Sequence, residues 1–158
     1  MGKAHRRERS SSFAGVYRKG LRARLGEAIP IPIEDGAGNF NIRFCEKVVG
    51  AAPKNIDALA FLGNAYTEAG EYRKGLEIDK RLALLRPGDS VVFYNLACSY
   101  ALLGQREEAF AALGRAVELG YRDVEHMRRD PDLESLRTDK RFEAVLEGAT
   151  SREMEPKR

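Results

Sequence analysis

Few residues in this chain of 158 could carry out catalytic chemistry, and their spacing brings none of them together. The two histidines, His5 and His126, are far apart in the sequence. Neither Cys45 nor Cys98 has a histidine nearby in sequence that could activate its thiol as a nucleophile. The pair Glu107-Glu108 lies near the start of an expected helix, where the helix dipole favours anions without any acid–base role. We therefore expect a protein that is not an enzyme.

Patterns for a cofactor or a metal are missing as well, so we expect neither. The stretch "GAG" at residues 36–38 lacks the Gly-Lys-Ser/Thr ending of a phosphate-binding loop and indicates a turn. Both cysteines fall within apolar helical patterns, where a free thiol behaves as a small buried hydrophobe. Two reduced cysteines favour a cytoplasmic location. The longest apolar run, residues 91–103, is too short to cross a bilayer, and this predicts no membrane span.

The charge of the chain is unevenly distributed. Residues 1–30 hold eight Lys/Arg against two Glu, so the rest of the chain is net acidic within a total of +3. We interpret residues 1–35 as a basic arm with an amphipathic helix over residues 13–25 and a Pro-rich linker. This arm could be a solubilising tail, a docking helix, or an electrostatic contact for RNA, a ribosome or an anionic surface. Its Arg- and Ser-rich start also resembles a mitochondrial presequence.

An internal repeat supplies the elements that would position a binding site. The stretches "FLGNAYTEAGEY" and "NLACSYALLGQR" begin 34 residues apart, and similar residue types recur at that spacing. The apolar spacing predicts helix pairs at 56–69/71–86 and 90–103/105–119, with Gly70 and Gly104 in the turns. Leu59, Leu62, Gly63 and Tyr66 share a face of the first copy; Phe93, Leu96, Ala97 and Tyr100 share that of the second.

This period and these residue types resemble the tetratricopeptide repeat. The resemblance implies an all-α fold: a short right-handed α-solenoid of antiparallel helix pairs within residues 36–149. Its two full repeats would be 56–89 and 90–123, flanked by capping helices at 39–51 and 124–148 and followed by a disordered tail at 150–158. Two positions depart from the pattern. Asp79 stands where a large apolar residue is expected and would either reach solvent or mark a packing defect, and Tyr121 replaces the closing proline.

The flanking segments are expected to cover the ends of the stack. Asp130 caps Pro131 at a first helical position, which ends the helix that starts at Val124. The ending "LGYRDVEHMRRDPDLESLRTDKRF" is similar to the tail that follows the last repeat in bacterial tetratricopeptide proteins. The expected capping residues are Ile42, Phe44, Cys45, Val48 and Val49 at one end, and Leu133, Leu136, Phe142, Val145 and Leu146 at the other.

The resemblance also implies a binding surface, since first helices of tetratricopeptide repeats line a concave groove that holds a partner peptide or helix. The predicted partner-binding residues are Phe61, Asn64, Tyr94, Asn95, Cys98 and Arg129. Tyr94 is expected to lead, because it offers a large contact area with few rotors to freeze. Asn64, Asn95 and Arg129 stand where some family members clamp a terminal carboxylate, but Ala60 and Glu125 replace the lysines of that clamp.

We therefore predict a non-catalytic protein–protein interaction module that binds a protein or peptide partner in this groove. The alternative is an adaptor for RNA, a ribosome or an anionic surface that acts through the basic arm. Homo-oligomerisation is left open by the sequence.

Overall fold

A computed structural model describes residues 38–151, and within them every regular element is a helix. The elements are α2 (Gly38–Ala51), α3 (Ile56–Glu68), α4 (Tyr72–Leu85), α5 (Ser90–Leu102), α6 (Arg106–Glu118), α7 (Val124–Arg129), the 3-10 helix η2 (Pro131–Leu136) and α8 (Lys140–Ser151). The predicted all-α fold is confirmed, and the four helices of the two predicted pairs begin and end within one residue of their expected bounds. The basic arm, its helix at 13–25 and its Pro-rich linker lie outside the described residues.

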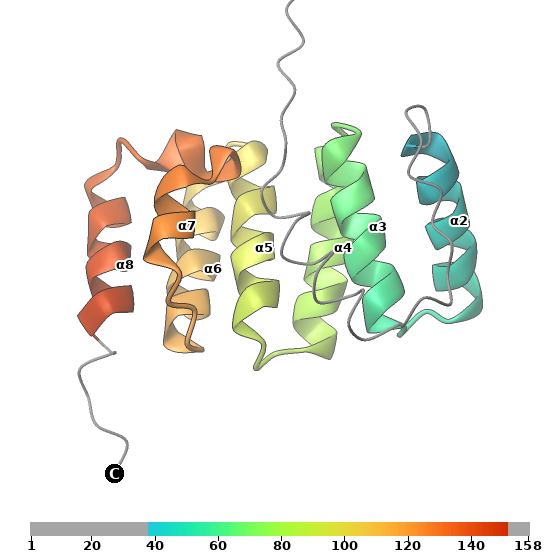
Figure 1. Ribbon diagram of the computed structural model, residues 1–158, viewed down its shortest axis with the longest axis horizontal. Helices are drawn as coiled ribbons and strands as arrows, with labels where there is room; N and C mark the ends of the chain where they lie inside the picture. The colour runs from blue at the N-terminus through green and yellow to red at the C-terminus, as the bar shows by residue number, and fades with distance from the viewer. Residues whose placement is uncertain (1–37, 152–158) are drawn as a thin grey trace, which may run out of the picture.

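The helices stand side by side in a row, with α2 at one end and α8 at the other (Figure 1). Helix α3 packs on α4 and α5 on α6, which are the two predicted pairs, and α4 packs on α5 to join them. At the ends, α2 packs on α3, while η2 packs on α5 and α8 on α6 and α7. Each helix thus contacts its neighbours in the row, which is the packing of a helical-repeat solenoid.

Helix boundaries recur at the same interval as the sequence pattern. Asn55 and Asp89, 34 residues apart, are the N-caps of α3 and α5, and their side chains accept hydrogen bonds from backbone amides of the first turn. Gly70 and Gly104 occupy the turns that follow α3 and α5, at φ values of 78° and 72°. A left-handed conformation favours glycine, so these two positions account for the sharp reversal inside each pair.

The core consists of two clusters along the row. One joins α2, α3 and α4 and reaches Val92 of α5, and the other joins α5 to the C-terminal elements and includes Leu76 of α4. The fully buried side chains with the largest volumes are Tyr94, Phe142, Leu59, Leu82, Leu113, Met127, Leu133, Leu136, Leu146 and Val92.

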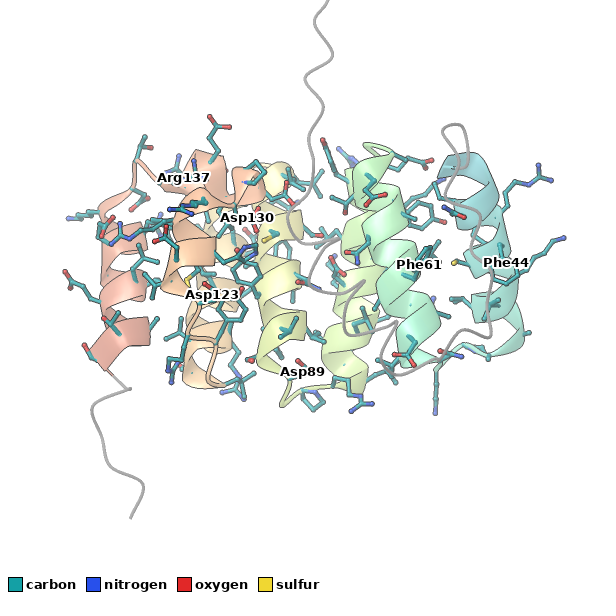
Figure 2. The ribbon with its side chains drawn as sticks, viewed as in Figure 1. Phe44, Phe61, Asp89, Asp123, Asp130 and Arg137 are labelled. Carbon is teal, nitrogen blue, oxygen red and sulfur yellow. The ribbon has the colours of Figure 1, made fainter. Side chains whose placement is uncertain are left out.

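The N-terminal cap is formed by α2, with one correction. Ile42, Cys45 and Val49 are buried with residues of α3 in one cluster, as expected. Phe44 is 44% exposed and does not belong to that cluster (Figure 2). Its neighbour Cys45 is on the packed face, and one residue earlier on a helix is about 100° away around the axis, so Phe44 turns away from α3.

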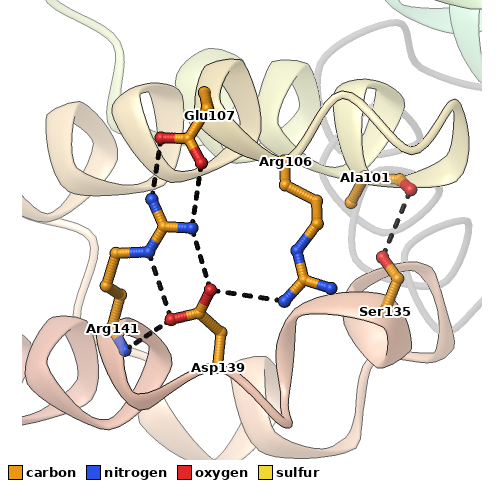
Figure 3. A network of polar contacts seen from close by, with 6 residues as sticks. All are labelled: Ala101, Arg106, Glu107, Ser135, Asp139 and Arg141. Atoms are coloured by element: carbon orange, nitrogen blue, oxygen red, sulfur yellow. Dashed lines mark hydrogen bonds and ion pairs between the residues drawn. The ribbon is translucent and has the colours of Figure 1, made fainter.

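The C-terminal cap combines apolar burial with a network of ion pairs. The predicted apolar residues Leu133, Leu136, Phe142 and Leu146 are buried against α5 and α6. Arg141 of α8 binds Glu107 of α6 through two hydrogen bonds of 2.8 and 3.0 Å. Asp139 bonds the same guanidinium at 2.8 Å and accepts a bond of 3.3 Å from Arg106 (Figure 3). Glu107 thus contributes to packing between helices.

Helix α8 extends two residues into the segment predicted to be a disordered tail. It continues through Ser151, because Ala149 in its last turn is fully buried and Thr150 bonds back to the carbonyls of Leu146 and Glu147. The rest of that predicted tail lies outside the described residues.

Candidate functional site

A small hollow lies between the first helices of the two pairs, α3 and α5, with contributions from α4 and η2. We call it the polar hollow. It is lined by Asn64, Thr67 and Glu68 of α3, Asp79 of α4, Asn95, Cys98, Ser99 and Leu102 of α5, and Asp132 of η2. Its cavity volume is about 20 Å³, which is room for one group of about the size of a water molecule.

Asp79 is a buried carboxylate in the lining of the polar hollow. Ser99 Oγ of α5 donates a hydrogen bond of 2.5 Å to Asp79 Oδ2. Burial raises the pKa of Asp79 to about 7, although the bond from Ser99 acts in the opposite direction. Gly63 of α3 leaves space for the carboxylate, since a Cβ at that position would lie 3.1 Å from Asp79 Oδ1. The expected choice between solvent and a packing defect is therefore wrong, because Ser99 bonds the buried carboxylate.

Asn64 and Asn95, both predicted partner-binding residues, are brought together in this hollow. The side chain of Asn95 is 9% exposed, and its Oδ1 has no hydrogen-bond partner among the described residues. An amide oxygen that is buried without a donor loses its hydration and gains no hydrogen bond in return. Asn95 is thus an unused acceptor in the lining of a cavity.

The lining of the polar hollow carries acidic groups and no basic ones. Glu68, Asp79 and Asp132 come from three different elements, and no Lys, Arg or His is among the lining residues. Arg129, which the clamp comparison would place with the two asparagines, is exposed on α7 and forms an ion pair with Glu125 of the same helix. The structure therefore does not bring Arg129 to Asn64 and Asn95.

Tyr94 requires the largest correction of the predicted site. Its side chain is fully buried, its hydroxyl donates a bond of 2.8 Å to Asp130 Oδ2, and its ring stacks on Tyr121 at 4.2 Å between centroids. Tyr94 therefore belongs to the core and does not project toward a partner. Sequence reasoning missed this because the covering groups, Tyr121 and Asp130, come from the segment after the second helix pair.

The remaining predicted residues divide between surface and core. Phe61 is half-buried and packs on the cluster formed by α2, α3 and α4. Cys98 lines the polar hollow but is itself buried, and burial together with the nearby Asp130 raises the pKa of its thiol well above the ordinary value. A thiol held neutral in this way is a poor nucleophile, which argues against covalent chemistry at Cys98.

A second polar cluster lies behind the hollow, around Asp130, and sequence reasoning foresaw only its capping role. Asp130 Oδ2 accepts the bond from Tyr94 and lies 3.3 Å from His126 Nε2, while Asp130 Oδ1 accepts from the Asp132 amide. Arg137 donates a bond of 2.6 Å to the Asp130 carbonyl (Figure 2). A carboxylate bound to groups of its own fold is a structural centre, and the spacing of Asp130 to Pro131 signalled only the helix start.

The pKa values in this cluster follow from those bonds. Burial opposes ionisation of Asp130, but hydrogen bonds from His126, the Asp132 amide and Tyr94 together lower the pKa of its carboxyl. The bond to Asp130 raises the pKa of His126 against the effect of burial. The pair is thus an ion pair between α7 and the start of η2 over a wide range of acidic to neutral pH.

These features define an all-α helical-repeat protein whose helices pack in neighbouring pairs and hold a polar hollow between two first helices. No family model matches the chain. The chain is similar to a chloroplastic protein from Arabidopsis thaliana, with 37% identity over 87 residues. That match covers 53% of this chain and 26% of the relative, so the chain spans about a quarter of that protein.

Two further searches of the described residues bear on function. No helix within residues 38–151 is both long and apolar enough to cross a membrane. In the same part of the chain, no three or more His, Cys, Asp or Glu side chains are grouped so that they could hold a metal ion.

Proposed function

We propose that this protein is a non-catalytic interaction module of the tetratricopeptide type, which binds a peptide or helix of a partner protein across α3 and α5. The interval of 34 residues between the N-caps Asn55 and Asp89, and between the turn residues Gly70 and Gly104, supports the repeat assignment. The observation that carries the binding proposal is the unpartnered amide oxygen of Asn95 in a cavity between first helices.

The contact residues follow from exposure as well as position. Asn64, Thr67 and Glu68 line the polar hollow from α3 and are not fully buried, and Phe61 lies one turn earlier on the same helix. They offer amide, hydroxyl, carboxylate and aromatic groups to a ligand backbone and its side chains. Tyr94 and Arg129, which the sequence suggested as leading contacts, are not part of this proposed surface.

The experiment is affinity capture of partners by the full chain, followed by mass spectrometry and by mapping of the bound segment with synthetic peptides of the recovered protein. Asn64→Ala and Asn95→Ala are expected to weaken peptide binding while the helical circular dichroism signal stays unchanged. Asn41→Ala is the matched control, because Asn41 is an amide on α2 that is not part of the hollow. Equal peptide binding by all three variants would contradict the proposal.

A second candidate function is supported by the charge distribution alone. The eight Lys/Arg of residues 1–30 could hold the protein on RNA, on a ribosome or on an anionic surface. Capture repeated after nuclease treatment separates the two functions. Loss of every partner on nuclease treatment would favour the arm over the α3–α5 surface.

A further inference from the structure

We propose that the polar hollow is a recognition pocket for a primary ammonium group, supplied by a lysine side chain of the bound partner peptide. This inference rests on the proposed function and names the chemistry of its central contact.

The first argument is the balance of donors and acceptors in the lining. Glu68, Asp79 and Asp132 bring carboxylates from three elements, and Asn95 brings an amide oxygen. A lysine ammonium has three N–H donors and no acceptor, so it matches a lining of this kind. A carboxylate ligand would meet like charges here and no basic side chain.

The second argument is the buried acceptor itself. Asn95 is nine-tenths buried, and its Oδ1 finds no donor among the described residues. A ligand that donates a hydrogen bond satisfies this oxygen and removes the cost of its burial. Asp79, in the same lining, receives one hydrogen bond within the described fold, from Ser99, and thus has acceptor capacity left for a ligand.

The third argument is size. A cavity of about 20 Å³ admits one water-sized group, and a compact ammonium has about that size. The planar guanidinium of arginine is larger and carries its donors in a rigid fork. The hollow therefore selects lysine over arginine, in contrast with an exposed acidic surface, which would attract both.

Occupation by a cation has a consequence for pH dependence. Burial raises the pKa of Asp79 to about 7 in the unliganded fold, and an ammonium beside it favours the ionised carboxylate. The other groups that face Asp79 are Glu68 of α3, Cys98 of α5 and Asp132 of η2. Cys98 stays neutral because its pKa is raised well above the ordinary value. Affinity for the cation is therefore expected to increase as Asp79 ionises.

The test is a titration of the full chain with Nα-acetyl-lysine methylamide, whose backbone carries no charge, observed by NMR at the side-chain amide of Asn95. We expect a saturable shift with the lysine compound and roughly tenfold or weaker binding of the norleucine and arginine compounds of the same form. Between about pH 6 and pH 8 the affinity should increase roughly tenfold, as Asp79 goes from mostly protonated to mostly ionised.

Asp79→Asn keeps the shape of the side chain and removes its charge, so it should weaken binding of the lysine compound by at least about tenfold at pH 8. Glu77→Gln is the matched control, because Glu77 is an exposed acid on the same helix that pairs with Lys80; it should bind as the unmodified protein does. Thermal unfolding of both variants verifies that each is folded.

The proposal is overturned if norleucine binds as tightly as lysine, if the affinity is independent of pH, or if Asp79→Asn binds normally. Failure of the proposed function looks different. In that case the lysine compound binds in the hollow, but peptides of the captured partners bind equally well to Asn64→Ala, Asn95→Ala and the unmodified protein.

Discussion

At the scale of single residues, Asp79 and Asp130 are two buried carboxylates that their surroundings treat in opposite ways. Asp79 receives one hydrogen bond, from Ser99, and burial raises its pKa to about 7. Asp130 is bonded by Tyr94, His126 and the Asp132 amide, and its pKa is lowered despite burial. The number of donors decides whether a buried carboxylate is ionised near neutral pH. Asp130 therefore serves the fold, and Asp79 is a group whose charge a ligand can change.

Asp79→Asn is expected to stabilise the protein at pH 8. A folded-state pKa above the ordinary 3.8 means that the folded protein holds this proton more tightly, so stability decreases as the pH rises from about 4 to about 7. The amide avoids burial of the charge, and the gain at pH 8 should be on the order of 2 to 4 kcal/mol, since one pKa unit corresponds to about 1.4 kcal/mol. Urea unfolding at pH 8 and pH 4.5 measures it. A gain that is equal at both pH values would contradict this account.

His126→Gln is expected to destabilise the protein by about 1 to 2 kcal/mol, because it removes a charged partner of a buried carboxylate. The lowered pKa of Asp130 makes the ion pair complete above its ordinary 3.8, and the contribution is lost as the pH falls through the lowered value. The raised pKa of His126 makes the contribution complete below its ordinary 6.5, and it is lost as the pH rises through the raised value.

The loss in His126→Gln should thus be largest between about pH 4 and pH 6.5 and decrease at higher pH, as urea unfolding across this range would show. Tyr94→Phe is the control, because it removes a neutral donor from the same carboxylate. Its cost should vary little over the range in which His126 titrates. An equal pH dependence in both variants would mean that the His126–Asp130 ion pair is not its source.

At the scale of elements, the pairing of α3 with α4 depends on a close approach at Gly63. A Cβ there would lie 3.1 Å from Asp79 Oδ1 and 3.3 Å from Ile78 Cγ2, so α4 packs directly against the backbone of α3. In α6, a Cβ added at Gly114 would have no neighbour within 4 Å. The two helical glycines therefore differ in packing and share the same intrinsic cost in a helix.

This contrast predicts opposite effects of alanine at the two positions. Gly114→Ala should stabilise the protein by roughly 0.5 to 1 kcal/mol, because alanine is the better helix former and meets no obstacle. Gly63→Ala has the same intrinsic gain but must displace a β-branched side chain and a buried carboxylate, and we expect a net loss of about 1 to 2 kcal/mol. Thermal unfolding of both variants decides; stabilisation by Gly63→Ala would show that α3 and α4 can separate without cost.

At the scale of the whole molecule, the row of helices ends in a cap that covers the last pair. Phe142, Leu146 and Ala149 of α8 are buried in the same cluster as α5 and α6, and Arg141 holds α8 to Glu107. A solenoid end that is left open exposes an apolar face. The C-terminal elements therefore belong to the folded unit.

Phe142→Ala should cost roughly 3 kcal/mol, since its ring is 2% exposed and its removal leaves a cavity. Leu84→Ala is the control, because Leu84 is 83% exposed and should change the stability little. Deletion of residues 123–158 should expose the apolar face of α5 and α6 and cause aggregation, measured by size-exclusion chromatography. An unchanged melting temperature of Phe142→Ala together with a monomeric truncated chain would mean that the segment is not a cap.

The dependence of partner capture on salt separates the α3–α5 surface from the basic arm. Binding in the polar hollow involves one buried charge, so it should persist at moderate salt and survive deletion of residues 1–12. Attraction through the eight Lys/Arg of residues 1–30 should decrease steeply with salt and fall on that deletion. Loss on truncation with normal capture by Asn95→Ala would place the function on the arm.

The amino-acid sequence by itself determined the helices, their pairing and the cap. The spacing of apolar residues, the caps Asn55 and Asp89, and the glycines in the turns act within a few residues of each element. Because these signals are local and occur twice, the bounds of the paired helices could be predicted to within one residue. The two asparagines of the hollow were also found from their places on the first helices.

The tertiary structure alone decided which side chains those helices expose. Tyr94 has the position of a groove residue, but Tyr121 and Asp130 of the later cap cover it. Asp79 has the position of a core residue, and Ser99 of the next pair makes its burial tolerable. Exposure and pKa depend on groups that are distant in the chain and meet only when the helices pack, so no local pattern contains them.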